Sequence, residues 1–536
     1  MTRTAAGASS GGTSRGAPDV IELATISSYL AHWASLRPSD TAVVSGAERL
    51  SWSALRERVD RCASGLEGLG VGRGDVVAML APQRWEFVVV YLALDRLQAV
   101  FLGLNTRHQL PELELVLNDA RPSVLLTVCD FSGRNYLRDA QRLRRRCSSI
   151  RTLVAIDAAS QEELKFEDLL TAGGNPPDVP QAVSATEPAC IVYTSGSTGR
   201  PKGAVLPRRG LLSNHRALAR VVAHQPFRAQ CDHPIDHVGG IDRLYLAVIL
   251  GGTLVLAERF RPQALLDQIA AEQITYWMGE ATQFVRCREY LHGKDLPDLR
   301  MINFVGSLPS GLLSELAQIS PTLMTGYGMT ECCSAVMRST WDTDLAALAR
   351  GVIGPLLDSM AGRIVGASGR VCEMGEVGEL QIRSACLFIG YLGMPEKTQE
   401  RFTADGWFAT GDLFAEDGPG VYRFVARIGD VFSSGGYNIY PREIEAVAAA
   451  HPAIEEAALI GVPDPAYGKV GWLYYTSVPD SHVTHEELRD FMRQSIANYK
   501  VPARIIQLDT MPHLPNSKAD TRELRRRAND AMADAP

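Results

Sequence analysis

Several features that would mark special classes of protein are absent from this sequence of 536 residues. Its ten cysteines include no Cys-x-x-Cys pair, which favours reduced thiols over a disulfide scaffold. A net charge of −7 provides no overall attraction to nucleic acid. No apolar run is long enough to span a membrane, because Asp95 and Arg96 interrupt the longest one.

The amino-terminal residues carry no targeting signal. Residues 1–18 are rich in Gly, Ser, Ala and Thr and contain no hydrophobic stretch, so we expect a disordered tail over residues 1–20. Cytoplasmic residence is the default expectation. The remaining chain is long enough for roughly two to four domains and, with 46% apolar residues, has an ordinary globular composition.

Helical and strand patterns alternate along most of the chain. Continuous apolar strands at residues 75–80, 99–104 and 301–305, with an amphipathic helix over residues 53–69, predict an α/β fold whose parallel sheets are covered on both faces. Short strands with frequent glycines between about residues 350 and 425 predict a small antiparallel barrel or sheet. A compact α+β unit follows, so we expect a large domain over residues 21–427 and a smaller one over residues 428–536.

The most informative segment is residues 193–203, Tyr-Thr-Ser-Gly-Ser-Thr-Gly-Arg-Pro-Lys-Gly. Its glycines permit tight turns that bring backbone N–H groups close to an anion, and its hydroxyls add further donors. A surface turn has the same composition, but an apolar strand over residues 190–193 leads into this loop. It is not a Walker loop, because Pro201 stands where that motif needs Gly and Gly203 follows Lys202.

Four further motifs follow in a fixed order. They are Thr-Gly-Tyr-Gly-Met-Thr-Glu at residues 325–331, Thr-Gly-Asp-Leu at 410–413, Arg-Ile-Gly-Asp at 427–430 and Pro-Asn-Ser-Lys at 515–518. Each alone is as typical of a turn, a helix cap or a surface loop. Together they resemble the adenylate-forming superfamily of acyl- and aryl-CoA synthetases, peptide-synthetase adenylation domains and luciferases, and the resemblance extends from about residue 25 onward.

The resemblance implies an ATP site and a mobile C-terminal domain that carries the catalytic Lys518. Tyr327 would stack on adenine, Thr330 would help to hold phosphate, and Glu331 would bind Mg²⁺, whose preferred ligands are oxygens. Lys518 would bridge the acid and the α-phosphate. The implied ATP contacts are Thr194, Ser195, Gly196, Ser197, Thr198, Gly199, Lys202, Tyr327, Asp412 and Arg427.

The resemblance also implies an acid pocket and a path for a thiol. Large apolar groups beside a small glycine floor suit an aryl or alkyl acid, although each could equally be ordinary core. The implied pocket residues are His237, Trp277, Met278, Val305, Gly306, Thr325 and Cys332. Gly435 and Gly436 would line the thiol tunnel, and Gly429 would be the hinge.

Several positions depart from the family pattern. Gly429 replaces the usual Asp or Lys of the hinge, and Ala426 and Ser517 replace glycines, so a chain specialised for one half-reaction is an alternative. Asp236 stands at a position that is usually apolar, whereas Val238 disfavours an amino-acid substrate. The run Cys-Asp-His-Pro-Ile-Asp-His at residues 231–237 superficially suggests a metal site, but no second Cys/His cluster accompanies it.

These patterns predict an ATP- and Mg²⁺-dependent ligase that joins a hydrophobic carboxylic acid to coenzyme A through an acyl-adenylate. The first alternative is an enzyme that loads a separate carrier protein, because phosphopantetheine ends both coenzyme A and carriers. A luciferase-like oxygenase and a catalytically silent ATP-binding protein are more distant alternatives. We expect small-molecule partners, without nucleic acid and without a membrane span.

Overall fold

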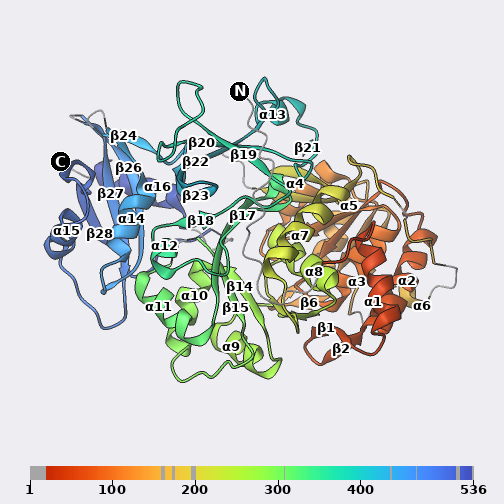
Figure 1. The fold of residues 1–536 in the computed structure, drawn as a ribbon. Coiled ribbons are helices and arrows are strands. Elements are labelled where there is room, and N and C mark those ends of the chain that lie inside the picture. Colours follow the sequence, from red (N-terminus) through yellow and green to blue (C-terminus); the bar gives the residue numbers. More distant parts are fainter. Residues whose placement is uncertain are drawn as a thin grey trace.

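The computed structural model describes residues 20–157, 163–171, 176–180, 182–194, 201–306, 308–434, 437–465, 467–514 and 519–533. Two eight-stranded sheets build the large N-terminal part, as Figure 1 shows. Both are mixed sheets in which a parallel centre carries antiparallel edge strands. The predicted α/β fold with a smaller C-terminal unit is confirmed.

The first sheet contains the strands that carry the expected acid-pocket residues. Its strands from β16 to β1 run parallel, and β17 and β2 are antiparallel edges. In spatial order they are β17 (Ser334–Arg338), β16 (Leu323–Met329), β15 (Met301–Val305), β14 (Tyr276–Glu280), β12 (Arg228–Cys231), β13 (Thr253–Leu256), β1 (Thr41–Ser45) and β2 (Glu48–Ser51).

The second sheet has the glycine-rich loop at one side. In spatial order its strands are β21 (Gly390–Tyr391), β11 (Lys202–Pro207), β10 (Pro188–Thr194), β4 (Val100–Leu104), β3 (Val76–Leu80), β5 (Val124–Thr127), β8 (Thr152–Ala155) and β9 (Leu164–Lys165). A small hairpin, β6 (Asp130–Phe131) and β7 (Arg134–Asn135), stands apart from it.

Helices pack on the faces of these sheets, and the apolar run noted in the sequence is one of them. Helix α3 (Trp85–Arg96) is buried from residue 86 to residue 96 and leads into the fully buried β4, as continuous apolar patterns predict. The other helices are α1 (Ile26–Leu36), α2 (Trp52–Gly68), α4 (Leu110–Ala120), α5 (Tyr136–Arg146), α6 (Phe166–Thr171), α7 (Arg208–Val222), α8 (Val238–Leu250), α9 (Pro262–Ala271), α10 (Ala281–Cys287), α11 (Ser310–Ile319) and α12 (Leu345–Ala349).

The glycine-rich region after residue 350 takes the form of an open antiparallel sheet with five strands. They are β18 (Val352–Gly354), β23 (Val421–Arg427), β22 (Phe408–Gly418), β20 (Gly378–Arg383) and β19 (Ala361–Val365), and the short α13 (Pro395–Gln399) lies between β21 and β22 in the chain. The described residues also include three short 3₁₀ helices, two in the N-terminal part and one in the C-terminal part. They are η1 (Arg288–Tyr290), η2 (Thr330–Cys332) and η3 (Asn498–Lys500).

The C-terminal elements have hydrophobic clusters of their own, made of residues from Phe432 onward. Figure 1 shows them in blue beside β22 and β23. They are β24 (Phe432–Ser434), β25 (Tyr437–Ile439), α14 (Pro441–Ala449), β26 (Ile454–Asp464), β27 (Gly468–Ser477), α15 (His485–Arg493), β28 (Arg504–Gln507) and α16 (Thr521–Ala533). The domain boundary expected at residue 427 stays a prediction.

Gly103, in the middle of β4, allows close contact between the second sheet and the segment that leads to α8. A Cβ atom at this position would lie 2.3 Å from the carbonyl oxygen of Ile235. Gly103→Ala should therefore lower stability by about 1–3 kcal/mol through overpacking, measured as the urea midpoint of unfolding. Gly68→Ala, in open space at the end of α2, is the matched control and should leave the midpoint unchanged or raise it. Equal midpoints for the two variants would contradict the packing argument.

Candidate active site

The glycine-rich loop connects two antiparallel strands. Thr194 ends β10 and pairs with Lys202, the first residue of β11. A Walker loop instead leads from a strand into a helix, so the geometry agrees with the sequence in excluding that motif. The loop residues Ser195, Gly196, Ser197, Thr198 and Gly199 lie outside the described residues.

Lys202 is linked to Glu331 through Tyr391, a residue that the sequence analysis missed. The Lys202 ammonium lies 5.0 Å from the centre of the Tyr391 ring, a cation–π contact. The Tyr391 hydroxyl donates a hydrogen bond of 2.6 Å to Glu331 Oε1. Burial and the Glu331 carboxylate raise the pKa of Tyr391, so the hydroxyl remains protonated and able to donate.

Thr330 and Glu331 lie at the tip of the hairpin formed by β16 and β17. Both belong to η2, and both are buried, with exposed fractions of 8% and 9%. The N–H of Phe388 donates to the Glu331 carbonyl at 2.7 Å, so the segment before β21 holds the backbone as well as the side chain of this residue. A carboxylate is thus fixed beside a lysine.

A second group of motif residues forms where Tyr327, on β16, contacts the paired strands β22 and β23. The Tyr327 hydroxyl donates to Asp412 Oδ2 at 2.6 Å, and Arg427 Nε donates to Asp412 Oδ1 at 3.0 Å. Asp412 is only 2% exposed, whereas the Arg427 side chain is largely exposed. The structure therefore brings together three residues that are separated by 100 positions in the chain.

The expected acid pocket lies at the carboxyl ends of parallel strands, where α/β sheets bind ligands. Met278, on β14, is buried in the large core cluster, whereas its neighbour Trp277 points to the other face and packs on Phe284 at 4.6 Å. This placement favours a packing role for Trp277. Val305 ends β15, and Gly306 adopts a φ of +100°, which disfavours any side chain there.

Three further pocket candidates have partners in the protein. The Thr325 hydroxyl donates to the Phe304 carbonyl at 3.0 Å, and Cys332 is fully buried, which raises the pKa of its thiol. His237 is the N-cap of α8, and its Nδ1 accepts from the Gly239 N–H at 3.0 Å. Thr325 and His237 therefore help to fix the backbone around the strand ends, whereas the Cys332 thiol is part of the core.

The structure accounts for the unusual Asp236. Its Oδ2 accepts a hydrogen bond of 3.0 Å from Asn105 Nδ2, which follows β4. Burial raises the pKa of Asp236. Nearby Cys231 is fully buried with a pKa raised to about 12 by burial, so its thiol is an inert core group.

Of the remaining candidate residues, the structure describes only the expected hinge residue, Gly429. Gly429 lies in a turn with open space around its Cα and without a positive φ, so the backbone there does not require glycine. Gly435, Gly436 and Lys518 lie outside the described residues. Within the described ranges, no three His, Cys, Asp or Glu side chains are arranged to hold a metal ion by themselves.

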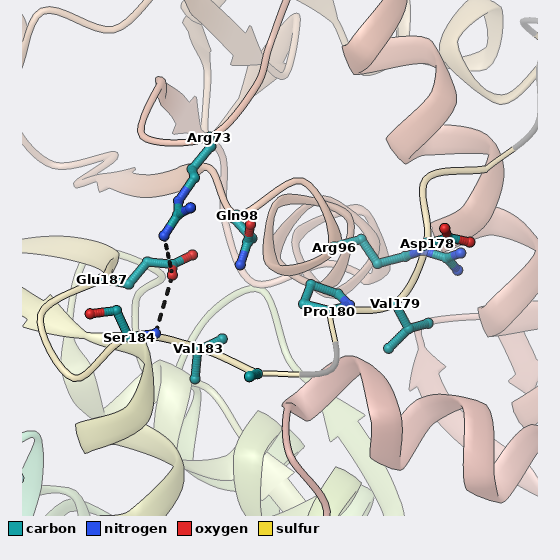
Figure 2. A pocket seen from close by; sticks show the side chains of 10 residues that line it. Arg73, Arg96, Gln98, Asp178, Val179, Pro180, Val183, Ser184 and Glu187 are labelled. Atoms are coloured by element: carbon teal, nitrogen blue, oxygen red, sulfur yellow. Dashed lines mark hydrogen bonds and ion pairs between the residues drawn. The ribbon is translucent and has the colours of Figure 1, made fainter.

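A hollow of about 620 Å³ lies between the turn before β3 and the segment before β10. Figure 2 shows Arg73 pointing at Glu187, whose carboxylate it contacts at 3.1 Å. Arg96 donates to the Pro177 carbonyl at 2.9 Å and pairs with Asp60. Both arginines thus have partners in the protein, and none of the described lining residues belongs to a motif above.

A family model for the AMP-binding enzyme matches residues 30–392, and one for the AMP-binding enzyme C-terminal domain matches residues 443–518. The chain belongs to the AMP-binding enzyme family. Feruloyl-CoA synthase of an Amycolatopsis species is 33% identical over 499 residues, 92% of this chain and 97% of the relative. Indoleacetate–CoA ligase of Aromatoleum aromaticum is 31% identical over 508 residues, 93% and 97% of the two chains.

A solved structure agrees with these relatives. The o-succinylbenzoate CoA synthetase of Bacillus subtilis, in complex with its acyl-adenylate intermediate, has a TM-score of 0.79 and 27% identity over 95% of this chain and 98% of that chain. The predicted reaction class, an ATP-dependent acid–CoA ligase that proceeds through an acyl-adenylate, is confirmed. Among the residues that the structure describes, no helix combines the length and apolar character needed to cross a membrane.

Tyr391→Phe removes the hydroxyl that holds Glu331 and leaves the ring under Lys202. A hydrogen bond to a carboxylate contributes about 1.5–3 kcal/mol, so we expect adenylation, measured by ATP–pyrophosphate exchange, to slow about tenfold or more. Tyr391→Leu, which also removes the cation–π contact, should slow it further. The control is Tyr136→Phe, which loses a hydroxyl that donates to the Thr106 backbone carbonyl and to no motif residue. Unchanged exchange in Tyr391→Phe would contradict the role of the hydroxyl.

Proposed function

We propose that this AMP-binding enzyme activates a carboxylic acid that carries an aromatic ring and transfers the acyl group to coenzyme A. The feruloyl, indoleacetate and o-succinylbenzoate enzymes, to which the chain is similar, are all named for aromatic acids. Met278 and Val305 supply apolar side chains near the ends of β14 and β15, and the positive φ of Gly306 disfavours a side chain next to them. Val238, rather than a carboxylate, follows His237, which agrees with an acid that has no ammonium group.

The observation that carries the proposal is that two groups of motif residues meet at the β16–β17 hairpin, one through Glu331 and one through Tyr327. Lys202, Tyr391 and Glu331 form a group suited to the triphosphate, and Tyr327, Asp412 and Arg427 form one suited to the nucleoside. Tyr327 and Glu331 are four residues apart on or beside the same strand. ATP bound along the hairpin would therefore meet both groups, with its α-phosphate toward the strand ends of the acid pocket.

The first half-reaction joins two anions. A carboxylate oxygen of the acid attacks the α-phosphorus, and pyrophosphate leaves with the electrons of the broken P–O bond. Lys202 and Lys518 are assigned to offset the negative charge, with hydroxyl and N–H donors of residues 194–199 around the phosphates. In the second half-reaction the thiol sulfur attacks the acyl carbon, AMP leaves, and the thiol proton passes to solvent.

Glu331 fits the Mg²⁺ that this reaction class uses. Mg²⁺ is usually held by one or two carboxylates together with substrate phosphates and waters. Glu331 offers one such carboxylate, because Tyr391 occupies Oε1 and Oε2 accepts no hydrogen bond from a described residue. The ion, when bound, would neutralise phosphate charge.

The C-terminal unit is assigned the role of a mobile domain that carries Lys518. The division at residue 427 agrees with the separate clusters from Phe432 onward. Gly429 would serve as the hinge, and Gly435 and Gly436 would line the thiol path, since residues without side chains leave room for a narrow tunnel. Cytoplasmic residence is part of the same proposal.

An ATP–pyrophosphate exchange screen tests the function. The panel consists of ferulate, 4-coumarate, indoleacetate, benzoate, octanoate and phenylalanine. We expect the highest exchange rates with one of the first four, at least about tenfold above octanoate and phenylalanine. A preference for octanoate would contradict the aromatic assignment, and no exchange with any acid would contradict the proposed function. Incubation with coenzyme A or with a pantetheinylated carrier protein, followed by intact-mass measurement, distinguishes the two acceptors.

Lys518→Ala should separate the two half-reactions. Loss of a charge clamp in the transition state should slow acyl-adenylate formation by at least about 100-fold, whereas thioester formation from supplied acyl-adenylate should persist. Lys500→Ala is the control, since Lys500 lies in the same unit and pairs with Glu443 at 2.5 Å. Equal loss of both half-reactions in Lys518→Ala would refute the assignment.

A further inference from the structure

The turn that follows Glu331 has an unusual backbone. Cys333 has a φ of +58° and Ser334 a φ of +108°, and neither residue is glycine. The first value lies in the left-handed region that a helix cap can adopt, whereas the second lies outside it, where side chains are rarely found. Such a conformation persists only where surrounding contacts hold it.

Asn214, on α7, holds the turn from both of its ends. It is fully buried, and its Nδ2 donates to the Cys332 carbonyl at 3.2 Å and to the Ala335 carbonyl at 2.7 Å. The two acceptors enclose the two residues with positive φ. One amide group therefore bridges the strained part of the hairpin.

His215, the next residue of α7, is connected to the same turn through the carboxylate of Asp242. The Ser334 hydroxyl donates to Asp242 Oδ2 at 2.8 Å, and Asp242 Oδ1 lies 2.6 Å from His215 Nε2. His215 Nδ1 lies 2.7 Å from the Leu211 carbonyl. Each ring nitrogen of His215 thus lies against an oxygen, so the ring links the α7 backbone to the Asp242 carboxylate. Burial alone would raise the pKa of Asp242, but His215 and its other partners outweigh burial and lower it.

The two strands of the hairpin are in close contact at Gly328, beside Ser334. A Cβ atom on Gly328 would lie 2.1 Å from the Ser334 carbonyl oxygen, so the two strands touch at this point. Beyond the turn, Phe388 and Tyr391 hold Glu331 from the second sheet. Displacement of the turn would therefore move Thr330 and Glu331 relative to Lys202.

We infer that Asn214, His215, Asp242 and Ser334 are positioning residues, which fix the strained turn and thereby place Thr330 and Glu331 for adenylation. The inference rests on the proposed function and adds to it a set of buried residues outside the assigned ATP contacts. None of the sequence motifs includes Asn214, His215 or Asp242. Their role follows from the contacts that α7 and α8 make with one hairpin.

The test compares Ser334→Ala with Ser334→Gly. Both lose the hydroxyl, but glycine adopts a φ of +108° without strain, so the pair separates the hydrogen bond from the backbone conformation. Ser27→Ala is the matched control: its buried hydroxyl donates to the buried Asp95 at 2.5 Å, and it lies far from the motifs in the chain. A lower stability that is common to all three variants is thereby accounted for.

Two measurements are made on the full chain. The first is ATP–pyrophosphate exchange with ferulate or whichever acid of the panel is most active, beside thioester formation from supplied acyl-adenylate. We expect exchange to fall about tenfold or more in both Ser334 variants and to stay within about threefold of wild type in Ser27→Ala, with thioester formation little changed in all of them. The second is amide hydrogen exchange of residues 326–338 without ligands, which should rise in the Ser334 variants alone.

The outcomes separate this inference from the proposed function. Wild-type exchange in Ser334→Gly, or an equal fall in Ser27→Ala, would overturn the positioning role. Unchanged amide exchange in the Ser334 variants would overturn it as well. If the wild-type chain activates no acid at all, the proposed function fails, and the amide exchange of residues 326–338 still decides whether these residues hold the turn.

Discussion

The hydrogen bond between the Tyr391 hydroxyl and the Glu331 carboxylate joins the two large sheets at the point where the chemistry is assigned. Tyr391 belongs to the edge strand β21 of the second sheet, whereas Glu331 lies at the tip of the hairpin that ends the first. A buried carboxylate is costly unless donors surround it. The Tyr391 hydroxyl supplies one such donor to Glu331, and the Tyr391 ring contacts the Lys202 ammonium, so a single side chain joins both charged groups.

This constraint explains why the site needs so many separate elements. Attack by a carboxylate on a phosphate brings like charges together, and the opposing charges must already be in place when ATP binds. Strand β11 contributes Lys202, β22 contributes Asp412, and the β16–β17 hairpin contributes Tyr327 and Glu331. No single element could supply all of these groups in one orientation, so the relative position of the sheets is itself part of the candidate site.

Much of the fold could be predicted from the sequence because its strands are short apolar runs between clear breaks. The helix–strand unit of α3 and β4 is an example, as every residue of β4 is buried. The exact ends of the elements were predicted less well. The strand expected over residues 75–80 begins at Val76, and the helix expected over residues 53–69 covers residues 52–68. Antiparallel edges such as β17 were not expected, since an edge strand has the same apolar pattern as its neighbours.

The candidate site was predictable only where a motif carried it. Lys202, Glu331 and Asp412 stood out by their spacing to glycines and hydroxyls, whereas Tyr391 lies 60 residues from its partner and no local pattern links the two. Asp236 seemed out of place until Asn105, from a distant strand end, supplied its partner. Met278 and Trp277 were indistinguishable in the sequence, and only the alternation of β14 placed them on opposite faces.

The assigned acid contacts and the assigned nucleotide contacts lie on different strands of the first sheet. This separation bears on how the substrate specificity of such an enzyme can change. The assigned acid contacts lie at the ends of β14 and β15, whereas the nucleotide contacts lie on the next hairpin, which α7 and α8 hold through Asn214 and Asp242. Substitutions at Met278 or Val305 alter the volume of the pocket without touching those hydrogen bonds. A change at Asp242 would affect the hairpin and the acid contacts together. Asp242 accepts from Ser334, and the next residue of α8, Arg243, donates to the Met278 carbonyl at 3.0 Å. We therefore expect substitutions at the strand ends to disturb the hairpin less than substitutions along α8.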